Sequence, residues 1–152
     1  MQKILTRALG RSASQSPINN VASAGVYEGE YNAAGQSEGY GTSRYANGNV
    51  YEGQWKADKA EGRGTARYAD GDVYEGEYKA DKMEGSGTYR YTNGLHKVGF
   101  FKAGKDVGEG VLFSADGQTA ARLRDGKFVM EARRIDAHGL PLPEGVVDFT
   151  DV

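Results

Sequence analysis

Apolar and polar residues alternate with a period of two along the middle of this chain, a pattern typical of β-strands with one buried face. In the segment VYEGQW one face would carry Tyr51, Gly53 and Trp55, and the opposite face Val50, Glu52 and Gln54. In GRGTARY one face would carry Gly62, Gly64, Ala66 and Tyr68, and the opposite face Arg63, Thr65 and Arg67. Together the two segments predict a β-hairpin with one aromatic, glycine-rich face and one charged face.

The hairpin pattern is repeated along the chain. The stretch YEGQWKADKAEGRGTARYADG, from Tyr51 to Gly71, returns almost unchanged as YEGEYKADKMEGSGTYRYTNG from Tyr74 to Gly94. Alignment on Y-x-G divides the chain into units 26–49, 50–72 and 73–95 and a degenerate unit 96–118. A period of about 23 residues excludes propeller blades and the common helical repeats, and the scarcity of leucine excludes leucine-rich repeats. We therefore predict an all-β domain of successive hairpins over residues 26–118.

Turn residues and glycines recur at fixed places in each unit. The pairs Asn47-Gly48, Asp70-Gly71 and Asn93-Gly94 join the units and favour the left-handed conformations of tight hairpin turns. Glycine within a strand costs about 0.5–1 kcal/mol relative to alanine, so its repeated use needs a compensating contact. We expect aromatic rings to cover the bare glycine backbone of neighbouring strands, namely those of Tyr51, Trp55, Tyr68, Tyr74 and Tyr78.

The charged face carries acidic and basic residues at equivalent positions of the first three units: Glu28, Glu52 and Glu75 with Arg44, Arg67 and Arg90. We expect cross-strand ion pairs between these two sets, each contributing about 0.2–1 kcal/mol. Exposed pairs of this kind would support strand register and solubility more than stability.

The composition of the chain excludes several classes of function. The chain has 152 residues, a formal net charge of −2, 23 Gly, 10 Tyr and no Cys. The absence of cysteine excludes disulfides, thiolate metal sites and a cysteine nucleophile. No basic excess points to nucleic acid as a partner, and no run of apolar residues is long enough to predict a membrane-spanning helix. The length suits one domain with tails.

Residues 1–25 form a basic N-terminal segment without an acidic residue. If residues 1–11 are helical, cations fall on one face and apolar residues on the other, which would suit contact with an anionic membrane. The residues of this predicted contact are Lys3, Ile4, Leu5, Arg7, Leu9 and Arg11. Three interpretations stay open: an organelle transit peptide, an interfacial helix, and a frayed or disordered terminus.

Residues 119–152 lose the glycine and tyrosine signature and form a C-terminal segment of mixed composition. Pro141 and Pro143 disfavour a helix near its end. The stretch from Arg122 to Ile135 would either extend the sheet or form a short helix, and its periodicity does not decide between the two.

The pattern Y-E-G-x-[YW]-x(6)-E-G-x-G-x(3)-Y-x-[DN]-G resembles the MORN repeat, the membrane occupation and recognition nexus motif. Three units match closely, and the fourth keeps Gly99, Phe101, Gly108, Gly110 and Gly117. The fourth unit has Lys97 and Ser114 where the motif has tyrosines. The resemblance implies an elongated, curved single antiparallel sheet of successive hairpins. It also implies a non-enzymatic role in assembling proteins at membranes or the cytoskeleton, often with self-association.

The fourth unit also departs from the repeat on its charged face. Positions that are Glu75, Glu77, Thr88 and Arg90 in the third unit become Val98, Phe100, Val111 and Phe113. An end cap alone would favour polar residues there, so we predict that something packs on this face. The preferred cover is the C-terminal segment, folded back through Phe128, Ile135, Leu140, Leu142, Val147 and Phe149. The alternative is a partner chain, including a homodimer through the last repeat.

No set of residues predicts catalysis, a cofactor or a metal. The two histidines, His96 and His138, have no metal-ligand or nucleophile spacing. Carboxylates recur at equivalent repeat positions, which indicates architecture and not one tuned acid–base pair. The stretch EGRGTARY lacks the Lys-Ser/Thr of a phosphate loop. We therefore predict a protein that is not an enzyme and has no cofactor.

Three functions stay open. The first is a cytoplasmic scaffold, associated with a membrane or the cytoskeleton, that binds a protein or a second copy of itself through an aromatic groove or its end face. The second is membrane-lipid binding through residues 1–11, because residues 26–118 carry 11 basic and 15 acidic side chains, a net charge of −4. The third is a small-ligand module that holds a quaternary ammonium group between rings, although Trp55 is the one tryptophan. The groove residues are Tyr27, Tyr31, Tyr45, Tyr51, Trp55, Tyr68, Tyr74, Tyr78 and Tyr91.

Overall fold

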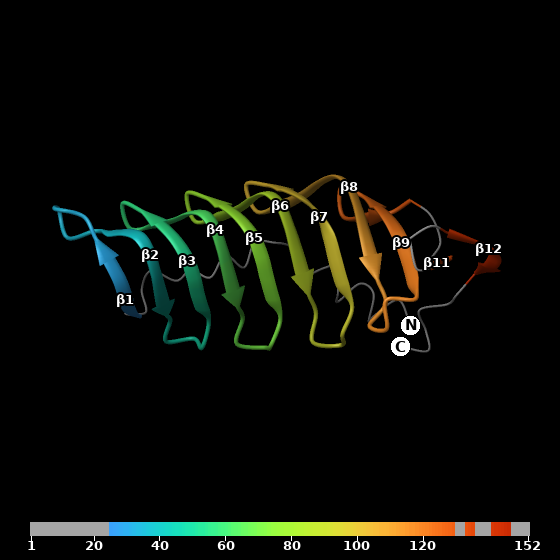
Figure 1. The fold of residues 1–152 in the computed structure, drawn as a ribbon, viewed down its shortest axis with the longest axis horizontal. Coiled ribbons are helices and arrows are strands. Elements are labelled where there is room, and N and C mark those ends of the chain that lie inside the picture. The colour runs from blue at the N-terminus through green and yellow to red at the C-terminus, as the bar shows by residue number, and fades with distance from the viewer. Residues whose placement is uncertain (1–24, 130–132, 136–140, 147–152) are drawn as a thin grey trace.

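The computed structural model of the chain describes residues 25–129, 133–135 and 141–146. They form one antiparallel sheet in the order β1 to β9, β11 and β12, and β10 pairs with β9 (Figure 1). The strands are β1 Val26–Tyr31, β2 Ser37–Arg44, β3 Val50–Lys56, β4 Lys59–Arg67, β5 Val73–Lys79, β6 Lys82–Arg90, β7 His96–Lys102, β8 Lys105–Phe113, β9 Thr119–Arg124, β10 Lys127–Phe128, β11 Arg133–Ile135 and β12 Pro141–Val146. The predicted all-β sheet of hairpins is confirmed, whereas the predicted N-terminal helix or disordered segment lies outside the described residues. None of the described residues forms a helix long and apolar enough to span a membrane.

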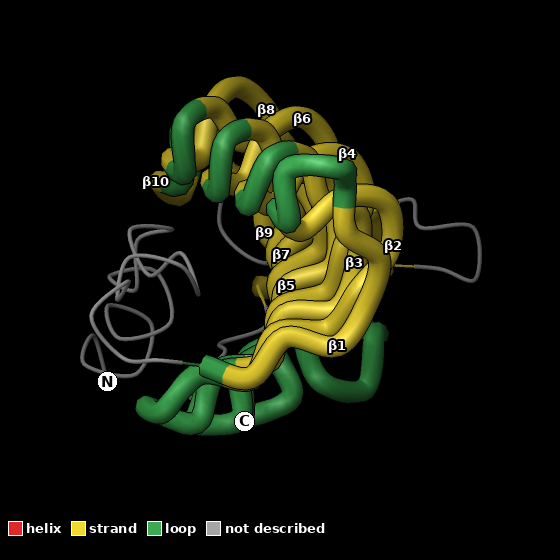
Figure 2. The backbone as a smooth tube through the Cα atoms, turned by 90° about the vertical axis from the view of Figure 1, so that its left-hand side faces the viewer, coloured by secondary structure: helices red, strands yellow, loops and turns green. Residues whose placement is uncertain are grey.

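The sheet is a curved trough that buries one of its faces. Figure 2, a view from the β1 end, shows the strands curving between two rims of turns. In β3 the predicted inner residues Tyr51 and Trp55 are 0% and 7% exposed, whereas Glu52 and Gln54 are exposed. Because a single sheet can shield a face only by curling over it, the aromatic residues line the concave side. The predicted division into an aromatic face and a charged face is confirmed.

A β-bulge in each hairpin helps to bend the sheet. The register between β3 and β4 shifts after Gly53, so that Gly53 faces Gly64 while Trp55 faces Ala60. Gly62 lies at this shift with a φ of 86°, a left-handed conformation that favours glycine. Bulges of this kind increase local twist and bend the strand, so their repetition supports the curvature of the trough.

Two kinds of turn alternate along the sheet. Within hairpins, Ala57-Asp58 and Ala80-Asp81 have positive φ at both residues, as in a type I′ turn. Between hairpins the predicted turns are present, but in each pair only the glycine is left-handed, at Gly48, Gly71 and Gly94. The two-residue left-handed turns therefore lie within hairpins, at these two Ala-Asp pairs and also at Ala103-Gly104 and Asp125-Gly126. Asp and Gly tolerate the left-handed region better than most residues.

Carboxylates at the rim tie each turn to the preceding hairpin. The Asp58 carboxylate accepts a hydrogen bond from the backbone N–H of Ser37 at 2.7 Å, and Asp81 accepts one from Ala60 at 2.7 Å. Three glutamates accept hydrogen bonds from turn N–H groups at 2.9 Å in a similar way: Glu38, Glu61 and Glu84. These recurring acids hold the backbone together, which explains why they recur.

The prediction of ion pairs on the charged face is wrong. Glu52 lies directly between Thr42 and Thr65 of the neighbouring strands, and Arg67 lies between two valines. The acidic and basic sets therefore form separate rows across the strands. Ion pairs form instead in the fourth hairpin and beyond it, between Lys97 and Asp106 and between Glu109 and both Arg122 and Arg124.

The C-terminal segment continues the sheet at its edge. β9 pairs with β8, β11 pairs with β9, and β12 pairs with β11. The described parts of the stretch from Arg122 to Ile135 are therefore sheet and not helix. Of the residues predicted to fold back, Phe128, Ile135 and Leu142 lie in these added strands, and Leu140, Val147 and Phe149 lie outside the described residues. Packing of this segment on the apolar face stays a prediction.

Candidate functional site

The inner face is built from aromatic rings seated on glycines. A Cβ added at Gly64 would lie 2.3–2.5 Å from atoms of the Tyr51 side chain, and one at Gly87 would lie 2.5–2.7 Å from the Tyr74 side chain. The Tyr51 hydroxyl also donates a hydrogen bond to the carbonyl of Gln54 at 2.9 Å. The prediction that rings compensate for strand glycines is thus confirmed for Tyr51 and Tyr74.

Seven rings form a continuous edge-to-face ladder along the trough. Neighbouring centroids are 5.0–5.3 Å apart and the interplanar angles are 79–90°, in the order Tyr31, Tyr27, Trp55, Tyr51, Tyr78, Tyr74 and Phe101. The ladder starts at Tyr31, which is 58% exposed, and ends at the buried ring of Phe101. Such contacts contribute about 0.5–1.5 kcal/mol each beyond the area that they bury, so the ladder couples neighbouring hairpins.

The residues of the predicted aromatic groove form the core of the sheet. Six of them are buried, namely Tyr51, Trp55, Tyr68, Tyr74, Tyr78 and Tyr91, whereas Tyr27 and Tyr45 are partly buried. Burial raises the pKa of each of the five buried tyrosines above its usual value of 10.0. A quaternary ammonium group needs an open ring face, which these buried rings do not offer.

Two further core rings are not among the predicted groove residues. Tyr89 is buried and stacks on Tyr68 with the centroids 6.0 Å apart, and Phe101 ends the ladder. Their positions within the repeat are those of Ala66 and Trp55 in the second unit. The alternation of inner and outer positions along a strand could therefore have identified both as inner-face residues.

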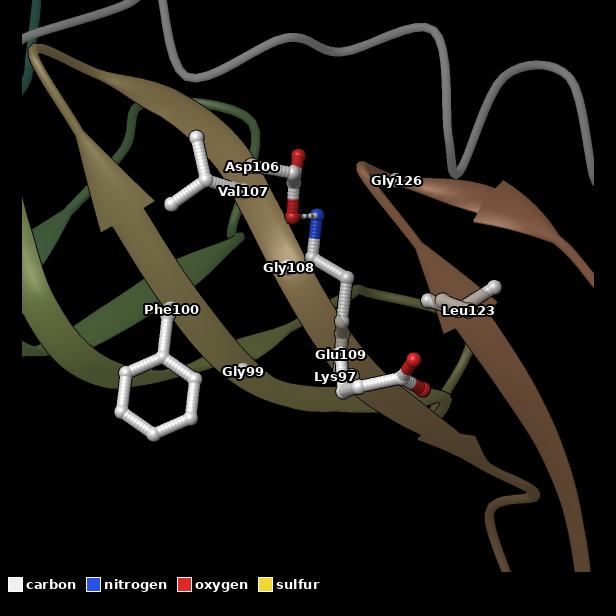
Figure 3. Close-up of a pocket in the computed structure, with 10 residues that line it drawn as sticks. Lys97, Gly99, Phe100, Asp106, Val107, Gly108, Glu109, Leu123 and Gly126 are labelled. Atoms are coloured by element: carbon white, nitrogen blue, oxygen red, sulfur yellow. Dashed lines mark ion pairs between the residues drawn. The ribbon is translucent and has the colours of Figure 1, made fainter.

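A buried ion pair replaces the seated tyrosine in the fourth hairpin. The Lys97 Nζ atom lies 2.6 Å from an Asp106 carboxylate oxygen, and the two side chains are 4% and 18% exposed (Figure 3). The ammonium also lies 5.4 Å from the ring centroid of Phe101 and 5.8 Å from that of Tyr89. Lys97 stands out in the sequence as a departure from the motif, whereas Asp106, at the position of Ala60 and Met83 in the preceding units, was not predicted as a site residue.

The ring seat of the fourth hairpin is open. At Gly110, the counterpart of Gly64 and Gly87, the heavy atoms nearest to an added Cβ would be the Val98 carbonyl oxygen at 3.2 Å and the Gly99 Cα at 3.7 Å, and not a ring; a Cβ added at Gly99 would meet nothing nearer than 3.5 Å. A shallow hollow at this place is bordered by Lys97, Asp106 and Leu123 (Figure 3). The substitution of one tyrosine by lysine thus leaves a gap in the inner face.

The outer face of the fourth hairpin carries the predicted apolar residues, which we call the apolar patch: Val98, Phe100, Val111 and Phe113. Val98 and Phe100 are 43% and 55% exposed, and Val98 faces Val111 across the strands. Phe113 stacks on His96 with the centroids 5.0 Å apart, and partial burial lowers the pKa of His96. The structure therefore brings the four predicted residues together on one surface.

Polar residues border the apolar patch on the β9 side. Arg122 faces Val111, and the Glu109 carboxylate accepts hydrogen bonds from Arg122 and Arg124. These hydrogen bonds hold the pKa of Glu109 below its usual value, and the hydrogen bond from Arg124 has the larger effect. The patch thus has an apolar centre with a charged margin.

A row of exposed lysines follows the rim at the turns within hairpins. They lie in facing pairs at the strand ends beside these turns: Lys56 with Lys59, Lys79 with Lys82, and Lys102 with Lys105. The neighbouring carboxylates are engaged with backbone N–H groups, as described above. Strands in a sheet are about 4.8 Å apart, so the six lysines follow one another along this rim, with these carboxylates among them.

Nothing in the described part of the chain assembles a metal centre from three or more histidine or carboxylate ligands. His96 contacts Phe113 on the outer face, and His138 lies outside the described residues. The predicted membrane-contact residues, Lys3, Ile4, Leu5, Arg7, Leu9 and Arg11, also lie outside them.

Comparison with known proteins agrees with this geometry. A family model described as the MORN repeat matches four consecutive segments, residues 27–50, 51–73, 74–96 and 98–119. These matches cover more than half of the chain and coincide with the four hairpins. No curated protein sequence matches the chain.

Proposed function

The chain belongs to the MORN repeat family, and from this premise we propose that it is a non-enzymatic interaction module that binds a protein through its apolar patch. The observation that carries the proposal is the exposure of Val98 and Phe100 on the outer face of the fourth hairpin. The equivalent residues of the third hairpin are Glu75 and Glu77, so the repeat has no structural need for apolar residues there.

The form of the apolar patch supports a protein partner. Its residues lie on the adjacent strands β7 and β8, where Val98 faces Val111, whereas single exposed apolar residues are ordinary on protein surfaces. An apolar centre with a polar margin is the usual anatomy of a protein interface. A second copy of the chain is the first candidate partner, because an uncharged patch can meet its own copy across a twofold axis without like-charge repulsion.

The test converts the outer face of the fourth hairpin into that of the third. In the variant Val98→Glu/Phe100→Glu/Val111→Thr/Phe113→Arg every introduced residue already occupies the equivalent position of the third unit. We expect analytical ultracentrifugation to show a concentration-dependent mass above that of a monomer for the wild type and a monomer for the variant. The circular dichroism of the two proteins should be the same.

Glu75→Gln/Glu77→Gln is the matched control, because it changes the third hairpin without touching the apolar patch; it should sediment like the wild type. A wild type that stays monomeric at every concentration contradicts self-association. A variant that associates as strongly as the wild type contradicts the assignment to the apolar patch.

A second candidate function is contact with an anionic membrane, which the row of rim lysines favours. Each lysine close to an anionic surface contributes about 1 kcal/mol. Removal of three of these charges in Lys56→Gln/Lys79→Gln/Lys102→Gln should therefore weaken binding to phosphatidylserine vesicles by about 100-fold. Vesicle flotation at low and high salt measures this effect.

The variant Arg44→Gln/Arg67→Gln/Arg90→Gln is the matched control, because it removes the same charge from strand ends at the opposite rim and should bind like the wild type. A chain without residues 1–25 tests the N-terminal alternative in the same assay. If that deletion abolishes flotation while the lysine variant floats normally, the rim is not the membrane site.

A further inference from the structure

β1 lies at one end of the sheet (Figure 1), and in the part of the chain that the structure describes no strand pairs with its outer edge. Val26 and Tyr31 at its two ends are 62% and 58% exposed. An edge strand presents unpaired N–H and C=O groups that can pair with a strand of another chain.

The aromatic ladder also stops at this edge with one contact missing. In the later hairpins the ring equivalent to Tyr31 contacts the first-strand tyrosine of the preceding hairpin. These contacts are 5.3 Å between Trp55 and Tyr27, 5.0 Å between Tyr78 and Tyr51, and 5.2 Å between Phe101 and Tyr74. Among the described residues the ring neighbour of Tyr31 is Tyr27 of its own hairpin.

The internal copies show which strand the edge of β1 is shaped to receive. β3, β5 and β7 are the counterparts of β1, and each pairs with the second strand of the preceding hairpin. In all three pairings two glycines of that second strand face the inner positions, as Gly39 faces Trp55 and Gly41 faces Gly53. The second glycine of each pair is in turn covered by a tyrosine of its own hairpin, as Gly64 is covered by Tyr51.

We propose that the β1 edge binds a β-hairpin of the same repeat type supplied by another protein. The partner's second strand, with glycines at alternating positions, pairs with β1 by backbone hydrogen bonds. The partner's first-strand tyrosine covers one of those glycines and packs on the exposed ring of Tyr31. The contact continues both the hydrogen-bond ladder and the aromatic ladder past the end of the sheet.

The described strands at the opposite end of the sheet do not offer such a hairpin, so we expect the partner to be a different protein. The four second strands with alternating glycines, β2, β4, β6 and β8, are already paired on both sides. The strands beyond β8 have the sequences TAARLR, KF, RRI and PLPEGV, which lack the alternating glycines. Head-to-tail polymerisation of one kind of chain is therefore not the expected assembly.

The test uses a synthetic peptide with the sequence of residues 50–72 as the incoming hairpin and the full chain as the receptor. We expect the labelled peptide to bind in fluorescence anisotropy and to shift the amide NMR signals of β1 but not those of β12. Tyr31→Ala in the chain, or Tyr51→Ala in the peptide, should weaken binding about tenfold, the effect of losing one aromatic contact. Tyr40→Ala is the matched control, because Tyr40 is equally exposed in the same hairpin but lies on the outer face.

A fusion provides a second measurement that does not depend on folding of the free peptide. Residues 50–72 inserted directly before Val26 should raise the urea midpoint of unfolding, and the same fusion with Tyr51→Ala should raise it less. The proposal is overturned if the peptide does not bind at millimolar concentration and the fusion leaves the midpoint unchanged. Equal binding to wild type and Tyr31→Ala also overturns it.

Discussion

Replacing Asp106 with methionine should lower the free energy of unfolding by about 3–5 kcal/mol. The change leaves the Lys97 ammonium buried without its carboxylate, at a place where its other neighbours are the rings of Phe101 and Tyr89. An unpaired buried charge is among the most destabilising features a core can contain. Urea unfolding followed by circular dichroism measures the change, and a shift of the midpoint with an unchanged slope shows that the folded state lost stability.

The double variant Lys97→Tyr/Asp106→Met should recover the lost stability and be at least as stable as the wild type. It installs the pair Tyr74 and Met83 of the third hairpin, and the new ring would enter the open seat beside Gly99. Exchange of a buried ion pair for packed apolar residues is often neutral or stabilising by about 1–4 kcal/mol. A double variant that is no more stable than Asp106→Met would show that the fourth hairpin is not equivalent to the third.

Raising the pH above 10 should unfold the sheet within about one to two pH units. Six buried tyrosines keep their protons in the folded state because burial raises their pKa: Tyr51, Tyr68, Tyr74, Tyr78, Tyr89 and Tyr91. In the unfolded chain the same groups ionise near their usual pKa of about 10. The folded state therefore binds more protons above pH 10, and stability falls as the pH rises.

The expected loss is large because the tyrosines act together. Each contributes about 1.4 kcal/mol per pH unit, so six contribute about 8 kcal/mol per pH unit, comparable to the whole stability of an ordinary domain. Tyrosinate absorbance and circular dichroism should change in one common step and recover when the pH returns to neutral. Gradual growth of tyrosinate absorbance from pH 10 with an unchanged circular dichroism would contradict the burial of these rings.

Features that depend on spacing along the chain could be predicted from the sequence. Alternation placed Tyr51 and Trp55 on the buried face, and the repeat placed the apolar patch on one surface of the fourth hairpin. The glycine seats followed from the cost of glycine in a strand, and the structure confirms them under Tyr51 and Tyr74.

Contacts that depend on the register between neighbouring strands could not be predicted in the same way. Arg67 lies two residues beyond Thr65, the residue that faces Glu52, so the predicted ion pairs do not form. Lys97 and Asp106 are separated by a turn and a bulge, and they face Leu112 and Phe101 instead of each other, so strand pairing alone does not reveal their contact. The rim bonds of Asp58 and Asp81 cross from one hairpin to another.

The sequence by itself determined the repeating hairpin and the side of the sheet on which each side chain lies, because both follow from the two-residue period of a strand and the length of the unit. Only the tertiary structure decided how neighbouring strands are aligned, because bulges and turns shift the register by whole residues without a strong trace in the sequence. That alignment joins the rings into one ladder and leaves Tyr31 as its open end. In the fourth hairpin the structure pairs Lys97 with a carboxylate, whereas the tyrosine at the equivalent position of the other hairpins covers a glycine.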